Sequence, residues 1–166
     1  QGRPRIKLGD SFEVVLRQAD AAPDKHNILL HRIGVGAQRM GVEPPIALRG
    51  LEQWLDGAPL VAFHAAFDEA LIQRAAQASL GHRLGNPWLD LAPVAAALRP
   101  DIQARSLDDW LERFDIRCAV RHQAAADSVA TAELLLKLWP AACSQLRRVD
   151  FAALQRLAAR WRWLQR

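Results

Sequence analysis

The stretch Leu60-Val61-Ala62-Phe63-His64-Ala65-Ala66-Phe67-Asp68 decides how this chain can fold. Its first four residues form a short continuous apolar run, which predicts a strand buried on both faces. From about Ala66 to Ala78 apolar residues then recur at helical spacing, and Gly81 provides a helix stop. Asp68 therefore lies in the first turns of a predicted helix that directly follows a strand.

A second aspartate occupies a comparable place in Arg121-His122-Gln123-Ala124-Ala125-Ala126-Asp127. The longest helix is predicted to begin near Gln123 and to end at Trp139, before Pro140. On such a helix Asp127 begins the stripe that faces the core.

Each aspartate thus raises the same question. An ionised carboxylate on a core-facing stripe must be paired, hydrogen-bonded or bound to metal, because an unpaired buried charge is costly. For either aspartate alone a simpler interpretation is open, since a negative charge near a helix N-terminus gains about 0.3–1 kcal/mol from the macrodipole. His64 and His122 precede the two aspartates, at spacings that have little meaning alone. From the loop before its helix, His122 could reach the same cavity as Asp127.

The remaining sequence predicts a mixed α/β order in which helices flank a sheet. Residues 11–17 alternate between apolar and mostly polar side chains, as a half-buried strand does. Pro44-Pro45 introduces a helix that Asp56-Gly57 closes. Ser106 and Asp109 have the spacing of a capping pair at the start of a further helix.

Residues 148–166 are predicted to form a separate basic amphipathic helix, after a domain that spans residues 1–147. Its apolar residues recur at helical spacing, while its arginines lie mostly elsewhere: Arg148, Arg156, Arg160, Arg162 and Arg166. Two interpretations are open. The helix packs on the domain, or it forms a surface for docking or for nucleic acid.

Composition bounds the class of protein. The 166 residues are 51% hydrophobic, which is enough to bury a core. A formal charge of +4 and a pI near 9.8 permit a polyanionic partner without establishing one. Cys118 and Cys143 fit neither a disulfide framework nor a zinc pattern.

No apolar run approaches the roughly 20 residues that span a bilayer. We therefore expect no membrane contact and a soluble, cytoplasmic protein. The opening Gln1-Gly2-Arg3-Pro4-Arg5 has the character of neither a translation start nor a signal peptide, which indicates a fragment of a longer protein.

Taken together, residues 60–68 and 121–127 resemble two motifs of the DEDDh family of 3′–5′ exonucleases, of the type found in the epsilon subunit of DNA polymerase III. The first segment resembles the family's second motif, and the other resembles its third, His-x4-Asp. Residues 106–111 resemble the helix between these motifs, and His31-Arg32-Ile33-Gly34 resembles a stretch that precedes them. The likeness is ordered along the chain and extends to about Trp139.

The resemblance implies an RNase H-like mixed sheet flanked by helices, and a site for two divalent ions, Mg²⁺ or Mn²⁺. In such a site Asp68 and Asp127 would be metal ligands, and His122 would be the general base that takes a proton from the attacking water. Phe63 and His64 stand where the family often has His-Asn, and they are candidates for contacts to the terminal nucleotide.

The family's first motif, Asp-x-Glu on a strand, is missing from the sequence. Asp10-Ser11-Phe12-Glu13 has the wrong spacing, and residues 11–17 resemble the family's third strand. We therefore expect the first motif upstream of Gln1 and the N-terminal strands of the sheet to be truncated. With two of the four carboxylates, this chain is predicted to bind metal weakly and to hydrolyse little or nothing.

The sequence thus predicts an α/β domain of a proofreading-type 3′–5′ exonuclease that acts on single-stranded DNA or frayed 3′ ends. Expected partners are a DNA polymerase subunit and a second copy of the chain, which would cover the exposed sheet edge. Two alternatives stay open. One is a non-catalytic remnant that serves as a binding or scaffold module, and the other is an RNA-processing relative that contacts the 2′-hydroxyl.

Overall fold

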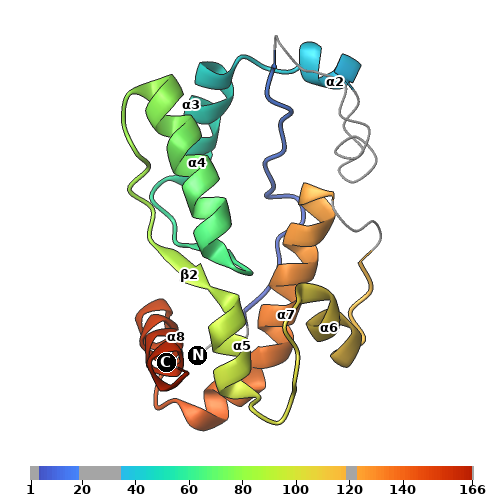
Figure 1. Cartoon of the computed structure of the whole chain (residues 1–166), viewed down its shortest axis with the longest axis vertical. Coiled ribbons are helices and arrows are strands. Elements are labelled where there is room, and N and C mark those ends of the chain that lie inside the picture. The colour runs from blue at the N-terminus through green and yellow to red at the C-terminus, as the bar shows by residue number, and fades with distance from the viewer. Residues whose placement is uncertain (1–3, 19–34, 119–122, 166) are drawn as a thin grey trace.

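The computed structural model describes residues 4–18, 35–118 and 123–165 of the chain. An extended N-terminal segment is followed by helices and two short strands (Figure 1). In chain order the elements are α2 (Val35–Arg39), α3 (Pro44–Leu55), β1 (Leu60–Ala62), α4 (Ala65–Leu80), β2 (Trp88–Asp90), α5 (Leu91–Leu98), α6 (Leu107–Arg113), α7 (Ala124–Gln145) and α8 (Phe151–Leu164).

A small parallel sheet links the two halves of the molecule. In the described part of the chain this sheet has two strands, with Leu60 opposite Trp88 and Ala62 opposite Asp90. Helix α4 connects the two strands, because parallel strands need a crossover of this kind. The predicted mixed α/β class is confirmed, in a mostly helical form with a minimal sheet.

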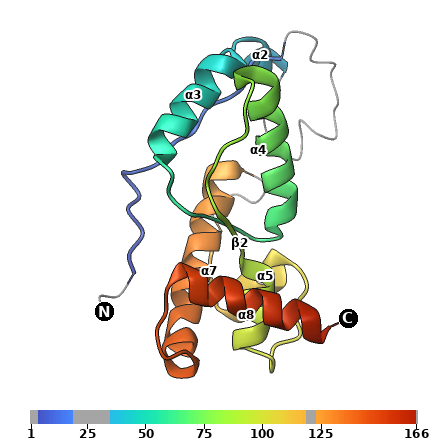
Figure 2. The same cartoon turned by 90° about the vertical axis from the view of Figure 1, so that its left-hand side faces the viewer.

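The larger core lies between α5, α6, α7 and α8, together with β2. Trp110 of α6 is 1% exposed, and Leu134 of α7 is fully buried. Helix α8 lies across α5 (Figure 2) and inserts Leu154 into this core. Helix α8 thus packs on the rest of the domain, which is one of the two interpretations that the sequence leaves open.

A smaller core lies between α3 and α4, which run side by side in both views (Figures 1 and 2). It is built from Leu55, Ala76 and Leu84. Gln73 of α4 is 6% exposed, and its side-chain amide forms two hydrogen bonds with the backbone of Leu84. Its Nε2 donates to the Leu84 carbonyl, and its Oε1 accepts from the Leu84 N–H, each at 2.8 Å.

Several local expectations are confirmed. Helix α3 begins at the two prolines and ends at Asp56, which adopts the left-handed conformation with φ 43°. Helix α4 ends at Gly81, with φ 81°, a conformation that glycine adopts without steric cost. Ser106 and Asp109 form the predicted reciprocal capping box of α6.

The prediction that Pro140 ends the longest helix is wrong, because α7 continues to Gln145. A proline inside a helix removes one hydrogen bond and crowds the preceding turn. Here the last turn carries Ala142, which is buried in the larger core. Burial of the turn beyond Pro140 offsets the local cost.

Residues 11–17 are extended, but they do not join the sheet as the alternation predicted. A single parallel bridge joins Leu16 to Val42, through backbone hydrogen bonds of 2.8 Å on each side. The segment lies beside α3, where the ring of Phe12 stacks on that of Trp54 at 5.9 Å. The apolar side of the segment is thus used in packing on a helix.

The expected burial of the first strand needs correction, and the expectation for residues 31–34 falls outside the described residues. Strand β1 is half-buried rather than buried on both faces. Residues 31–34, which resemble a family stretch, lie outside the described residues. Within the described part of the chain, no helix is both long and apolar enough to cross a membrane.

Replacing Gln73 by Met is expected to lower the free energy of unfolding by about 2 kcal/mol, because the buried N–H and C=O of Leu84 lose their partners. Urea denaturation followed by circular dichroism measures the change. Gln77→Met is the matched control, since Gln77 lies one turn later on α4 and is exposed. Equal midpoints for the two variants would contradict the role of Gln73.

The imidazole of His82 is expected to titrate above its ordinary pKa of 6.5, because its Nε2 lies 2.8 Å from Oε1 of Glu52. The folded chain is then stabilised fully below pH 6.5, and this contribution is lost as pH rises through the raised pKa of His82. An NMR titration of His82 measures the shift. Glu52→Gln should lower the pKa of His82 toward its ordinary value, because it removes the main cause of the shift, whereas Glu112→Gln on α6 should leave this pKa unchanged.

Candidate functional site

Asp68 lies in the first turn of α4, four residues beyond the short turn that follows β1. Its side chain is half-buried. Burial raises the pKa of Asp68 above its usual value; a backbone hydrogen bond opposes the shift, and the nearby negative charge of Asp90 adds to it. A carboxylate with a raised pKa beside a second carboxylate is typical of functional sites.

Asp90 is a site residue that the sequence analysis missed. It ends β2 and caps α5, and its side chain is 13% exposed. Its Oδ1 accepts hydrogen bonds from the backbone N–H groups of His64 at 2.9 Å and Ala92 at 3.1 Å. Its Oδ2 accepts from Nη2 of Arg162 on α8 at 2.7 Å. An aspartate directly before an apolar helical run is an N-cap signal, which could have identified this residue.

His64 and Phe63 form the turn between β1 and α4. His64 adopts the left-handed conformation, with φ 60° and ψ 48°, and its side chain is exposed. Its ring meets that of Phe63 edge-on at 4.7 Å, and its Nε2 lies 3.3 Å from the carbonyl oxygen of Arg105. Phe63 packs against the larger core. Of these two residues, His64 is the one exposed to solvent.

Asp127 lies in the first turn of α7 and is half-buried. The thiol of Cys118 donates to its Oδ1 at 3.6 Å. The hydroxyl of Thr131 donates to its backbone carbonyl at 2.8 Å. His122, the predicted general base, lies outside the described residues.

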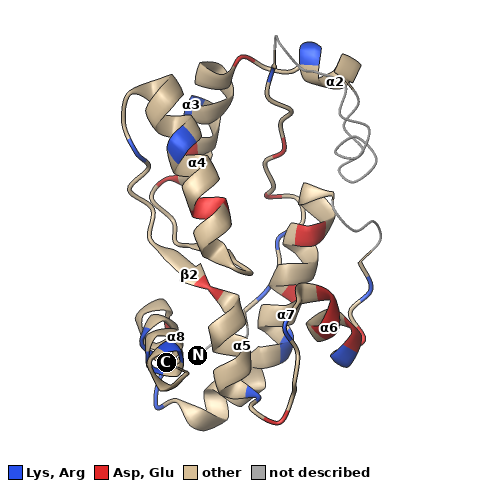
Figure 3. Cartoon of the chain, in the orientation of Figure 1, with Lys and Arg blue, Asp and Glu red and all other residues tan. Residues whose placement is uncertain are grey.

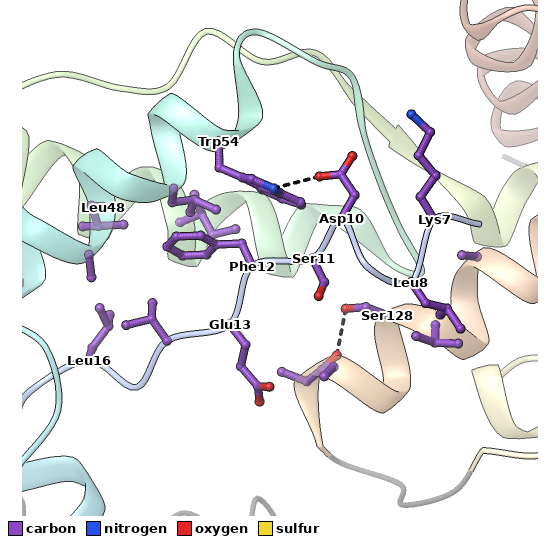
Figure 4. Close-up of a pocket in the computed structure, with 18 of the residues that line it drawn as sticks. Lys7, Leu8, Asp10, Ser11, Phe12, Glu13, Leu16, Leu48, Trp54 and Ser128 are labelled. Atoms are coloured by element: carbon purple, nitrogen blue, oxygen red, sulfur yellow. Dashed lines mark hydrogen bonds between the residues drawn. The ribbon is translucent and has the colours of Figure 1, made fainter. Parts of the chain in front are cut away.

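A groove of about 840 Å³ separates the helices that carry the two predicted metal ligands. Leu71 and Ile72 of α4 line one side, and Ser128 and Val129 of α7 line another. The N-terminal segment runs through it as an extended chain, with Trp54 of α3 above (Figure 4). Asp68 lies one turn before Leu71, and Asp127 directly precedes Ser128. The two carboxylates therefore belong to helices on different sides of a mostly apolar groove.

The described residues do not fit the ligand set of the predicted two-ion site. Among residues 4–18, 35–118 and 123–165, no three His, Cys, Asp or Glu side chains are grouped closely enough to hold a metal ion. The carboxylate whose charge acts on Asp68 belongs to Asp90, which already accepts from Arg162 and two backbone N–H groups. Mg²⁺ is held by one or two carboxylates that share an ion, together with waters and phosphate, whereas Asp68 and Asp127 lie on helices on different sides of the groove.

Comparison with known proteins finds relatives among DNA polymerase III proteins. A DNA polymerase III subunit epsilon-like protein of Rhodobacter capsulatus is 34% identical over 112 residues, which cover 65% of this chain and 16% of that protein. A PolC-type DNA polymerase III of Bacillus subtilis is 32% identical over 92 residues, or 55% of this chain and 6% of that protein. The PolC-type protein of Caldanaerobacter subterraneus subsp. tengcongensis is 32% identical over 104 residues, which cover 61% of this chain and 7% of that protein.

No family model matches the chain, and no solved structure matches it significantly. The chain spans between 6% and 16% of the length of these three relatives. The aligned regions cover more than half of this chain in each case. The chain is therefore related in sequence to the epsilon-like and PolC-type DNA polymerase III proteins, which confirms the predicted resemblance to the exonuclease family of the epsilon-subunit type.

Proposed function

We propose that this chain is a domain of a 3′–5′ exonuclease that acts on single-stranded DNA or frayed 3′ ends. The observation that carries the proposal is the relationship to epsilon-like and PolC-type proteins over more than half of the chain. The place of Asp68 supports it, because a half-buried carboxylate with a raised pKa follows a strand of the parallel sheet. An RNase H-like sheet, of which β1 and β2 would be one part, belongs to the same proposal.

In this proposal Asp68 and Asp127 are metal ligands, His122 is the general base, and Phe63 and His64 contact the terminal nucleotide. Mg²⁺ or Mn²⁺ would activate the attacking water and stabilise the leaving oxygen. Among the described residues, no group of three His, Cys, Asp or Glu side chains forms that metal site. The exposed imidazole of His64 and its fixed turn are consistent with a contact to a nucleotide.

The names of the relatives extend the proposal to partners. We assign a role in DNA replication beside a DNA polymerase, in the cytoplasm, because the relatives are named as DNA polymerase III proteins. A homodimer remains a prediction from the sequence.

A non-catalytic binding module is the second candidate, and a specific observation favours it. Within the described residues the acidic side chains around Asp68 do not form a metal-binding group. Asp90 is neutralised by Arg162 and held by backbone N–H groups, which is an arrangement that stabilises a fold. A domain of this kind could bind DNA or a polymerase without cleaving DNA.

Hydrolysis of a 5′-labelled single-stranded DNA in Mg²⁺ or Mn²⁺ separates the two candidates. The assay compares this chain with the chain extended through any native sequence that precedes Gln1. We expect a 3′-shortening ladder from the extended chain and little from this one. Asp68→Asn or Asp127→Asn should reduce the rate by about 100-fold or more, since a catalytic metal supplies several kcal/mol of transition-state stabilisation.

Asp101→Asn is the matched control for these variants. Asp101 is exposed and pairs with Arg99 in the turn after α5, and it lines no part of the groove. Its replacement should leave the rate unchanged. Retained DNA binding without a ladder from either chain would favour the binding module, and the absence of both would contradict both candidates.

A further inference from the structure

Helix α8 packs the middle of its apolar face within the fold. Ala153, Leu154 and Ala158 are buried, and Leu154 and Ala158 belong to the larger core. A helix that attaches to a membrane or to a partner's groove through an apolar face needs that face free. Both modes are therefore disfavoured for α8.

One flank of α8 is fixed against β2. The Nε2 of Gln155 donates to the carbonyl oxygen of Trp88 at 3.1 Å, and Arg162 binds Asp90 at 2.7 Å. With the apolar face buried and this flank held, the helix has one orientation. Its outer face is therefore a defined surface.

That outer face consists of Arg156, Arg160 and Trp163. Their i, i+4, i+7 spacing places them on one side of the helix, opposite Leu154 and Ala158 of the larger core. All three side chains are exposed, and Trp163 is 73% exposed. Tryptophan is enriched at binding interfaces, because it combines a large apolar ring with a polar N–H.

The charge on this face is not compensated within the described structure. The sequence of α8 contains no acidic residue, and Figure 3 shows basic residues without acidic ones along the helix. Neither Arg156 nor Arg160 forms a hydrogen bond or ion pair with any residue that the structure describes. Two aspartates that contact α8 have other partners, since Asp150 caps the helix and pairs with Arg148, and Asp90 pairs with Arg162.

The contact between Arg162 and Asp90 also links α8 to the candidate site. Asp90, which holds Arg162, also accepts from the backbone N–H of His64 and acts electrostatically on Asp68. Trp163 directly follows Arg162 in the chain. The C-terminal part of α8, which carries Trp163, is therefore linked to the turn that carries His64 through Arg162 and Asp90.

We propose that Arg156, Arg160 and Trp163 form a binding surface for single-stranded DNA. The two guanidinium groups would neutralise phosphates, and the indole would stack on an unpaired base. The choice of DNA among polyanions rests on the proposed function. The choice of a single strand rests on Trp163, because stacking on an exposed indole requires a base that is free of its partner.

The test is binding of a fluorescein-labelled oligo(dT) to the whole chain in EDTA, measured by anisotropy at several salt concentrations. Each phosphate contact contributes about 0.7 to the slope of log K against log salt for single strands. Removing two contacts in the double variant Arg156→Gln, Arg160→Gln should therefore lower the magnitude of the slope by about 1.4. Trp163→Ala should weaken binding by about fivefold or more.

The double variant Arg49→Gln, Arg83→Gln is the matched control. It removes the same charge from exposed positions on α3 and after α4, and its slope should stay close to that of the parent chain. An equal fall in slope for both double variants would overturn the proposal, because it would reflect net charge alone. An unchanged affinity in Trp163→Ala would overturn the choice of a single strand and indicate a surface for another polyanion, such as an acidic protein.

Because EDTA removes divalent ions, this measurement is independent of hydrolysis. Binding that depends on α8 without any cleavage in the nuclease assay would contradict the exonuclease and leave the DNA surface intact. Cleavage that is insensitive to the α8 variants, together with unchanged binding, would contradict the surface and leave the exonuclease intact.

Discussion

The carboxylate of Asp90 is the contact on which the arrangement of the candidate site depends. It joins three segments that are distant in the sequence: the turn after β1 through the N–H of His64, the start of α5 through Ala92, and α8 through Arg162. His64 adopts a left-handed conformation that costs of order 1–3 kcal/mol for a residue with a side chain. A hydrogen bond from its N–H to a charged acceptor offsets part of this cost. The geometry of the turn that leads to Asp68 therefore depends on Asp90.

Elements with local signals could be predicted from the sequence. The capping box of Ser106 and Asp109 depends on two side chains within one turn, and the left-handed ends at Asp56 and Gly81 are encoded by the residues that occupy them. The apolar periodicity predicts the helix that contains Asp68 to within about two residues at each end. In each case the deciding interaction lies within a few residues of the chain.

Interactions between distant segments could not be predicted in this way. The pair of Asp90 and Arg162 spans 72 positions, and neither residue type signals the other. The alternation of residues 11–17 was satisfied by packing on α3, because a half-buried surface can face a helix as well as a sheet. Pro140 does not end α7, because the turn beyond it buries Ala142 in the larger core. For Asp68 and Asp127 the sequence placed each residue on its helix, while their convergence on one metal site stays a prediction, since His122 lies outside the described residues.

The charges around Asp68 set a physical condition on any DNA-binding function. A phosphate that approaches Asp68 and Asp90 without a metal ion meets two carboxylates, and such repulsion extends over about 8–10 Å at physiological salt. Arg162 compensates the charge of Asp90, whose Oδ2 lies 2.7 Å from its Nη2. The positive charge of Arg162 is then no longer available to attract a phosphate. Net attraction then has to come from cations that are not already paired, and Arg156 and Arg160 on α8 meet that requirement among the described residues. Asp90 joins the acidic site to the basic helix α8. Under the proposed function the site would hold the reacting end, and the unpaired arginines of α8 would supply the attraction that holds the strand.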